Sequence, residues 1–157
     1  MTQGVMTQTR KVPEGYHTVQ PYLMFVNTVE AMAFYAKVFG SKEKLCMKSP
    51  EGRVHHAEIT IGDSVVMMAD ENPEIEAFAA GHYGGSPVSV MVYVDDCDTT
   101  YAKAVAAGAK SLREPTDQPY GDRMAGVLDP FGYKWWIAHS LASNATTSAA
   151  QNVEVAR

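Results

Sequence analysis

The chain has 157 residues, of which 46% are hydrophobic and 20% charged, so it can bury one sizeable core but not a second large domain. The formal net charge is −5 and the 13 lysines and arginines are scattered, which argues against nucleic acid as a partner. The apolar runs are too short to span a membrane and the polar start lacks a secretory signal. We therefore expect no membrane partner and a cytoplasmic location.

The first half of the chain predicts one strand, one helix and three more strands. Residues 18–26 have strand character, and Asn27 and Glu30 have the spacing of a capping box before an apolar helix that ends at Gly40. Three strand-like runs separated by glycine-containing turns follow, at 42–48, 54–61 and 64–70. The order of this half is therefore βαβββ.

The second half repeats this order after a linker rich in glycine and alanine at about 71–87. We expect a strand at 88–94, then a helix that Asp95 caps and Gly108 ends, and then three more strands. These last strands are predicted at 109–113, 123–128 and 134–139. Gly40 and Gly108 are 68 positions apart, so the two helices end in register between the halves.

The two ends of the chain differ from this repeat. Residues 1–15 carry no hydrophobic period and residues 142–157 are small and polar, so we expect a flexible N-terminal tail and a polar C-terminal tail. The single domain then spans 16–141, with modules at about 16–72 and 86–141. Two cysteines far apart in the chain predict free thiols rather than a disulfide framework or a zinc knuckle.

Several stretches of the sequence resemble one family. "AFYAKVFG", "YVDDCDTTYAKAVAAGAK" and "DPFGYKW" are similar to the vicinal oxygen chelate superfamily, which includes glyoxalase I, extradiol dioxygenases, fosfomycin-resistance proteins and bleomycin-binding proteins. "HAEITIGDSVVMMADE" and "PYGDRMAGVLDPFG" resemble its PhnB-like branch. The resemblance covers about residues 17–141. It implies an α+β fold in which two βαβββ modules form a curled eight-stranded mixed sheet around a cavity, and it implies a homodimer.

The resemblance also bears on metal binding. Metal-dependent members place a ligand on the first and fourth strand of each module, usually histidine, glutamine or glutamate. The family spacing here falls on Gln20, Met67, Ser89 and Trp136. A thioether is too soft for such a metal, a serine hydroxyl is a poor ligand and an indole cannot coordinate, and a one-residue slip of any strand gives no better set. We therefore expect no cofactor and no glyoxalase I activity.

His56 and Glu58 are the main candidates for chemistry. They are two positions apart in a predicted strand, so they share one face, and Ile59 and Ile61 on the other face are expected to pack under a helix. Glu58 could orient His56 as a general base. The two could also hold a divalent metal at a non-standard site, or form an ordinary hydrogen-bonded pair on the concave face.

A second group of polar residues lies near the predicted mouth of the cavity. Tyr120 and Arg123 belong to the loop "PYGDRMAG", and Arg123 could clamp an anionic ligand by its planar guanidinium. Alternatively, Arg123 forms a salt bridge to Asp122 or Glu114. Asp129 is expected to stabilise the turn before the last strand.

The adjacent Trp135 and Trp136 cannot both enter one core, because neighbouring side chains of a strand point to opposite faces. Ile137 shares a face with Trp135, and placing this pair under the helices leaves Trp136 on the concave side. There Trp136 could form a flat wall for a ligand, plug the cavity or pack in a dimer interface. By the same alternation, one of Met67 and Met68 packs under a helix while the other lines the cavity.

Three hypotheses for function follow. The first is a small-molecule-binding protein of the glyoxalase/bleomycin-resistance type, with a partly aromatic ligand in a metal-free cavity lined by Tyr22, Met24 or Phe25, Met67 and Trp136. The candidate ligand-binding residues also include Gln20, Ser89, Tyr120 and Arg123. The acidic net charge would favour a cationic ligand. The alternative is a metal-dependent or acid–base lyase, isomerase or dioxygenase that uses His56 and Glu58, and the third is a stable fold with an unrelated ligand. The missing metal ligands favour binding over catalysis.

Overall fold

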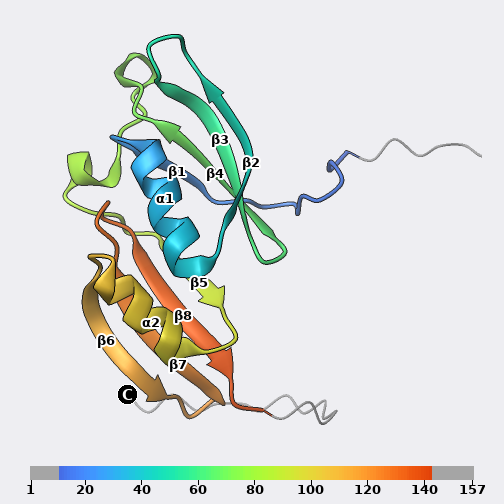
Figure 1. Cartoon of the computed structure of the whole chain (residues 1–157), viewed down its shortest axis with the longest axis vertical. Coiled ribbons are helices and arrows are strands. Elements are labelled where there is room, and N and C mark those ends of the chain that lie inside the picture. Colours follow the sequence, from blue (N-terminus) through green and yellow to red (C-terminus); the bar gives the residue numbers. More distant parts are fainter. Residues whose placement is uncertain (1–10, 143–157) are drawn as a thin grey trace, which may run out of the picture.

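The computed structural model describes residues 11–142 of the chain (Figure 1). The tails predicted at 1–15 and 142–157 lie mostly outside these residues, so the tails and the domain limits stay predictions. Neither helix within 11–142 has the length and apolar character needed to cross a membrane.

Two modules of the same order make up the domain. The first contains β1 (Tyr22–Phe25), α1 (Thr28–Phe39), β2 (Lys42–Lys48), β3 (Val54–Ile61) and β4 (Ser64–Asp70). The second contains β5 (Ser89–Tyr93), α2 (Cys97–Ala106), β6 (Lys110–Asp117), β7 (Asp122–Leu128) and β8 (Lys134–Ser140). The predicted duplicated βαβββ order is confirmed. The linker holds two short 3₁₀ helices, η1 (Pro73–Ile75) and η2 (Ala80–Tyr83).

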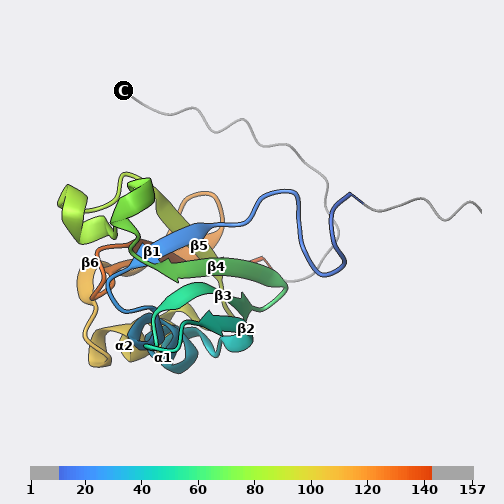
Figure 2. The ribbon, with the colours of Figure 1, turned by 90° about the horizontal axis from the view of Figure 1, so that it is seen from above.

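The eight strands form two four-stranded mixed sheets. Their strand orders are β1-β4-β3-β2 and β5-β8-β7-β6, and in each sheet the first pair is parallel while the other pairs are antiparallel. Helices α1 and α2 contact each other and lie on the same side of the strands (Figure 2). The opposite face of each sheet carries no helix within the described residues and is therefore available for a site.

Local signals fix most element boundaries. The Asn27 side chain accepts a hydrogen bond from the Glu30 backbone N–H at 3.2 Å, and Gly40 ends α1 in the left-handed conformation, as predicted. In the second module the helix cap is Asp96, which accepts from the backbone N–H of Thr99 at 3.2 Å. The prediction of Asp95 as the cap was wrong by one residue.

Two strands differ in length from the prediction. β1 is shorter than the predicted 18–26, because only Tyr22–Phe25 pair with β4. β6 is longer than the predicted 109–113 and runs through Pro115 to Asp117. This is possible because β6 is an edge strand and Pro115 lies at an irregularity in its register with β7, where no ladder hydrogen bond is lost.

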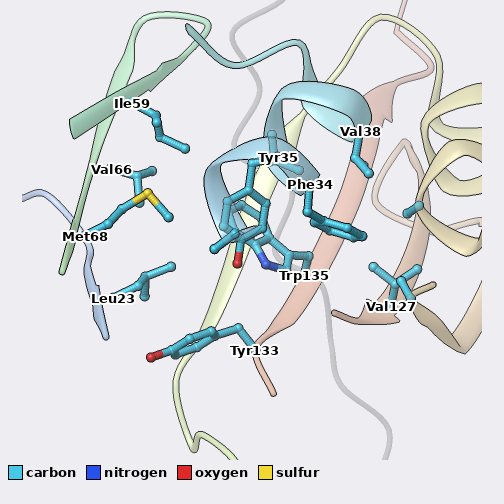
Figure 3. Close-up of a cluster of buried hydrophobic side chains, with 14 of the residues drawn as sticks. Leu23, Phe34, Tyr35, Val38, Ile59, Val66, Met68, Val127, Tyr133 and Trp135 are labelled. Carbon is cyan, nitrogen blue, oxygen red and sulfur yellow. The ribbon is translucent and has the colours of Figure 1, made fainter. Parts of the chain in front are cut away.

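One hydrophobic core joins the two modules. Trp135 from β8 packs against Tyr35 and Phe39 of α1, with ring centroids 5.1 and 4.8 Å apart, and Figure 3 shows Trp135 beside Tyr35. Tyr133 reaches the edge of β1. Its hydroxyl donates a hydrogen bond to the Met24 carbonyl at 2.8 Å and accepts one from the Met24 backbone N–H at 3.1 Å. The modules therefore hold each other in place across their seam.

A buried carboxylate strengthens this seam. Asp129, 3% exposed, accepts hydrogen bonds from the Tyr35 hydroxyl of α1 and from Trp135 Nε1, at 2.5 and 3.0 Å. It also accepts from the backbone N–H groups of Phe131 and Tyr133, both at 2.9 Å. The prediction that Asp129 stabilises the turn is confirmed, and the contact with α1 adds a second role that the sequence did not indicate.

The alternation of faces follows the sequence prediction. Trp135 is 1% exposed and belongs to the core, whereas Trp136 is partly exposed on the other face of β8. In β4, Met68 is fully buried and Met67 is partly exposed.

Cys97 is buried and Cys46 is partly exposed, and both are free thiols.

Candidate ligand-binding site

A chain of hydrogen bonds lies on the helix-free face of the first sheet. His56 Nε2 is 2.9 Å from Glu58 Oε1, and His56 Nδ1 is 2.8 Å from the Tyr22 hydroxyl. The other oxygen of Glu58 accepts from the Tyr16 hydroxyl at 2.5 Å. The strand alternation predicted for His56 and Glu58 is thus confirmed, and β1 and the segment before it supply two tyrosines to the pair.

Glu58 is held as a carboxylate. Its side chain is buried, and desolvation by itself raises its pKa, but the hydrogen bonds from Tyr16 and His56 outweigh this effect and leave the pKa below its ordinary value. An ionised carboxylate only accepts hydrogen bonds, so Nε2 of His56 carries a proton. The pKa of Tyr22 is raised by desolvation and by the nearby Glu58 charge, so Tyr22 stays a phenol.

The segment before β1, residues 16–21, adds to these hydrogen bonds on the helix-free face of the first sheet. The Tyr16 hydroxyl is hydrogen-bonded to Glu58, and the ammonium group of Lys44 lies 3.5 Å from the centroid of the Tyr16 ring. Gln20 fixes the same segment, because its side-chain oxygen accepts from the backbone N–H of His17 at 2.7 Å. The sequence did not indicate a role for Tyr16, which lies 42 positions from Glu58.

A pocket of about 530 Å³ opens beside β1, between this segment and the linker. Its lining includes three of the predicted ligand-binding residues, Gln20, Tyr22 and Ser89. Phe78 and Tyr83 of the linker line it as well, although no role was predicted for the linker. The sequence signal that could have indicated this role is the presence of two aromatic residues, Phe78 and Tyr83, in a linker of mostly small residues.

Within residues 11–142, the lining of this pocket is mostly apolar and carries no aspartate, glutamate, lysine or arginine. Phe25, one of two alternatives predicted to line the cavity, belongs instead to the core, while Met24 lines the pocket. A further hollow of about 600 Å³ on the other side of the linker, beside Pro130 and Lys134, contains none of the predicted binding residues. We therefore take the pocket beside β1 as the candidate site and call it the β1 pocket.

Trp136 and Met67 lie outside the lining of the β1 pocket. Trp136 faces the helix-free side of the second sheet, opposite Met91 on β5 and Gly126 on β7. A Cβ atom at Gly126 would lie only 2.3 Å from the Trp136 ring, so the indole occupies the space beside this glycine. Met67 is the neighbour of Tyr22 in the register of the first sheet.

Arg123 and Tyr120 are also apart from the β1 pocket. The guanidinium of Arg123 donates to both carboxylate oxygens of Asp98 on α2, at 2.6 and 2.9 Å, and to Asp117 on β6 at 2.9 Å. The salt-bridge alternative is thus the one observed, but its partners were predicted wrongly, because α2 approaches the helix-side face of β7. The Tyr120 hydroxyl is exposed and lies 3.6 Å from the sulfur of Met124.

The sequence profile of the Glyoxalase/Bleomycin resistance protein/Dioxygenase superfamily matches residues 17–137. The chain belongs to this superfamily. An uncharacterised protein from Mycobacterium bovis is 32% identical over 120 residues, which cover 74% of this chain and 79% of that protein.

Solved structures of the superfamily's fold agree with this membership. The crystal structure of TioX from Micromonospora is 26% identical, with a TM-score of 0.62 over 83% of this chain and all of the other. A PhnB protein from Bacillus cereus is 22% identical, with a TM-score of 0.62 over 79% of this chain and all of the other, and it shows the same fold.

The residues at the superfamily's metal positions do not fit a metal. The Gln20 oxygen already accepts a backbone hydrogen bond, and the other positions present a thioether, a hydroxyl and an indole. Both ring nitrogens of His56 and both oxygens of Glu58 are engaged in hydrogen bonds. Across residues 11–142, no three His, Cys, Asp or Glu side chains gather in a way that could hold a metal ion. No chemical step through a metal follows from these residues.

Proposed function

We propose that this chain is a small-molecule-binding protein of the glyoxalase/bleomycin-resistance type and that it holds a partly aromatic ligand, without a metal, in the β1 pocket. The observation that carries the proposal is that Gln20, Tyr22 and Ser89 line one apolar pocket of about 530 Å³. Ligand sites are usually apolar hollows of about 300–1,000 Å³ with a few polar groups that orient the ligand.

The lining indicates the kind of ligand. Tyr22, Phe78, Tyr83 and Tyr133 supply aromatic surface, which favours a planar ligand because ring contacts contribute about 0.5–1.5 kcal/mol beyond simple burial. The Ser89 hydroxyl and the amide nitrogen of Gln20 can orient a polar group. Because the lining has no charged side chain, the net charge of −5 acts only at long range, and the earlier expectation of a cationic ligand gains no local support.

A second copy of the chain fits the open faces of the two sheets. Members of the superfamily are often dimeric, and large apolar side chains are exposed on both helix-free faces: Met47 (54%) on the first sheet, and Met91 (42%) and Tyr93 (64%) on the second. A twofold dimer would cover both faces with the same contacts used twice. In such a dimer Trp136 and Met67 would extend the site as apolar walls.

Binding of a neutral planar probe, 2-naphthamide, tests the proposal. We expect 2-naphthamide to raise the melting temperature and to bind equally well in the presence of a chelator. Tyr83→Ala, at an exposed tyrosine of the pocket, should weaken binding, whereas Tyr101→Ala, at a tyrosine of α2 outside the pocket, should not. Binding that depends on added metal, or equal binding by both variants, would contradict the proposal.

An acid–base enzyme that uses His56 and Glu58 is the second candidate. The hydrogen bonds that join Glu58, His56 and Tyr22 favour it, because a carboxylate that orients an imidazole is a usual arrangement for a general base. It requires that a compound bound in the β1 pocket is turned over and that His56→Gln abolishes the turnover without abolishing binding.

A further inference from the structure

Tyr22 belongs to both parts of the site. It lines the β1 pocket, and its hydroxyl is hydrogen-bonded to His56. His56, Glu58 and Tyr16 are not among the residues that line this pocket. Within the described residues, Tyr22 is therefore the residue that connects a ligand in the pocket with His56 and Glu58.

The direction of the Tyr22 hydrogen bond follows from proton counting. Glu58 accepts from the Tyr16 hydroxyl and from Nε2–H of His56. A neutral imidazole with its proton on Nε2 has a lone pair on Nδ1, so Tyr22 must donate its proton to Nδ1. In the free protein, the Tyr22 oxygen therefore has only lone pairs to offer to a ligand.

We propose that the β1 pocket binds a ligand with an anionic oxygen, a carboxylate or a phenolate, at Tyr22, and that binding is coupled to uptake of one proton by His56. When the anionic oxygen arrives, the Tyr22 O–H turns toward it and leaves Nδ1 without a donor. Nδ1 takes a proton from solvent and donates it to the Tyr22 oxygen. The imidazolium is then paired with the Glu58 carboxylate, and no covalent bond between heavy atoms changes.

The charges around His56 support this coupling. Tyr22 faces it from β1, Glu58 from β3 and the uncharged Met47 from β2, while Tyr16 lies over Glu58. Lys44, the nearby cation, sits on the Tyr16 ring and adds to the lowering of the pKa of Glu58. Since the pocket lining within residues 11–142 holds no cation, a protonated His56 can compensate an anionic ligand at Tyr22.

The coupling fixes the sign of the pH dependence. A ligand whose binding takes up one proton binds more tightly as pH falls, by up to about tenfold per pH unit. A ligand of the same shape without an anionic oxygen leaves Tyr22 bonded to His56 and shows no such dependence. This inference rests on the proposed ligand-binding function of the β1 pocket.

Isothermal titration calorimetry with 2-naphthoate and its neutral analogue 2-naphthamide tests the inference. Titrations between about pH 6 and about pH 8, where histidine titrates, in two buffers of different ionisation enthalpy, count the protons taken up. We expect 2-naphthoate to take up about one proton, and 2-naphthamide none. His56→Gln should remove the proton uptake. Tyr22→Phe should remove the proton uptake and weaken the binding of 2-naphthoate relative to that of 2-naphthamide. His55→Gln, on the exposed opposite face of the same strand, should keep both.

The outcomes separate the inference from the proposed function. If 2-naphthamide binds but 2-naphthoate does not, or if 2-naphthoate binds without proton uptake, the inference is wrong and the pocket stands. Uptake that persists in His56→Gln also overturns it. If neither probe binds, both proposals fail.

Nitrogen NMR of the free protein gives a check that needs no variant: the proton of His56 should be on Nε2, and a proton on Nδ1 would overturn the inference.

Discussion

The hydroxyl of Tyr16 donates a hydrogen bond to Glu58 across 42 positions of sequence, at 2.5 Å. This contact ties the segment before β1 to the first sheet and helps to lower the pKa of Glu58, against the desolvation that raises it. A group with a lowered pKa in the folded state contributes stability above its unfolded pKa, and that contribution is lost as pH falls through the folded pKa.

Tyr16→Phe should therefore destabilise the protein near neutral pH by about 1–3 kcal/mol, because a buried carboxylate loses a donor. The difference from wild type should shrink in acid, as Glu58 becomes protonated. Urea unfolding measured at several pH values checks this. Tyr101→Phe is the control, because its hydroxyl bonds to the neutral Ser111, and a pH-independent difference is expected there. A Tyr16→Phe difference that stays constant with pH would contradict the prediction.

The two tryptophans should respond differently to substitution. Trp135 is 1% exposed and contacts α1, so Trp135→Ala should cost about 3–5 kcal/mol of stability. Trp136→Ala should leave the fold intact and weaken a planar ligand by about 0.5–1.5 kcal/mol, if Trp136 is a wall of the site in the dimer. Trp135→Phe leaves one indole whose fluorescence reports binding. Unchanged affinity in Trp136→Ala, or its unfolding, would assign both indoles to structure alone.

Gly126 should be intolerant of any side chain as long as Trp136 is present. A Cβ atom at this position would meet the indole at 2.3 Å, so Gly126→Ala should displace the ring. We expect this to lower the free energy of unfolding by about 1–3 kcal/mol and to shift the tryptophan fluorescence to longer wavelength. In a Trp136→Ala background the same substitution should cost much less. A double-mutant cycle measures this coupling, and additive costs would show that the ring does not rest on Gly126.

How far the sequence could predict this fold depends on whether the signal was local. The caps of α1 and the alternation at Trp135 and Trp136 involve neighbours in the chain, and they were predicted correctly. β6 was predicted too short because Pro115 looks like a strand breaker until the strand is known to be at an edge. The tie from Asp129 to α1 joins positions 94 apart, which no local pattern reports.

The candidate site was predictable only in part for the same reason. Strand alternation placed His56 and Glu58 on one face, but the link to Tyr22 depends on β1 and β3 meeting through β4. The Asp98 partner of Arg123 was missed because it lies 25 positions away on α2. Asp117 was missed because its pairing with Arg123 depends on the register of β6 with β7. The part played by the linker in the pocket likewise depends on how it folds back over β1.

Glyoxalase I activity should be absent, even with nickel or zinc added. That isomerisation needs a metal to hold two vicinal oxygens and a carboxylate to move the proton, and Met67 and Trp136 stand at the matching strand positions. Trp136→Glu alone should not restore it, because Met67 and Ser89 remain unsuited. Turnover of the hemithioacetal above the buffer rate, stimulated by metal, would contradict this prediction.

The protein should be a homodimer at micromolar concentration, measured by sedimentation. Met91→Asp, on the open face of the second sheet, should shift it toward monomer because a charge would be buried without a partner. Ile75→Asp, at an exposed residue of the linker, is the matched control and should leave the dimer unchanged. A wild-type monomer, or equal effects of both variants, would count against the dimer.

A crystal structure of the protein grown with 2-naphthamide and a chelator is the decisive test of metal-free binding in the β1 pocket. We expect electron density for the ring system in this pocket, in contact with Tyr22 and within hydrogen-bonding distance of Gln20 or Ser89, with no metal ion beside it. Density for the ligand elsewhere on the chain, with the β1 pocket empty, would contradict it.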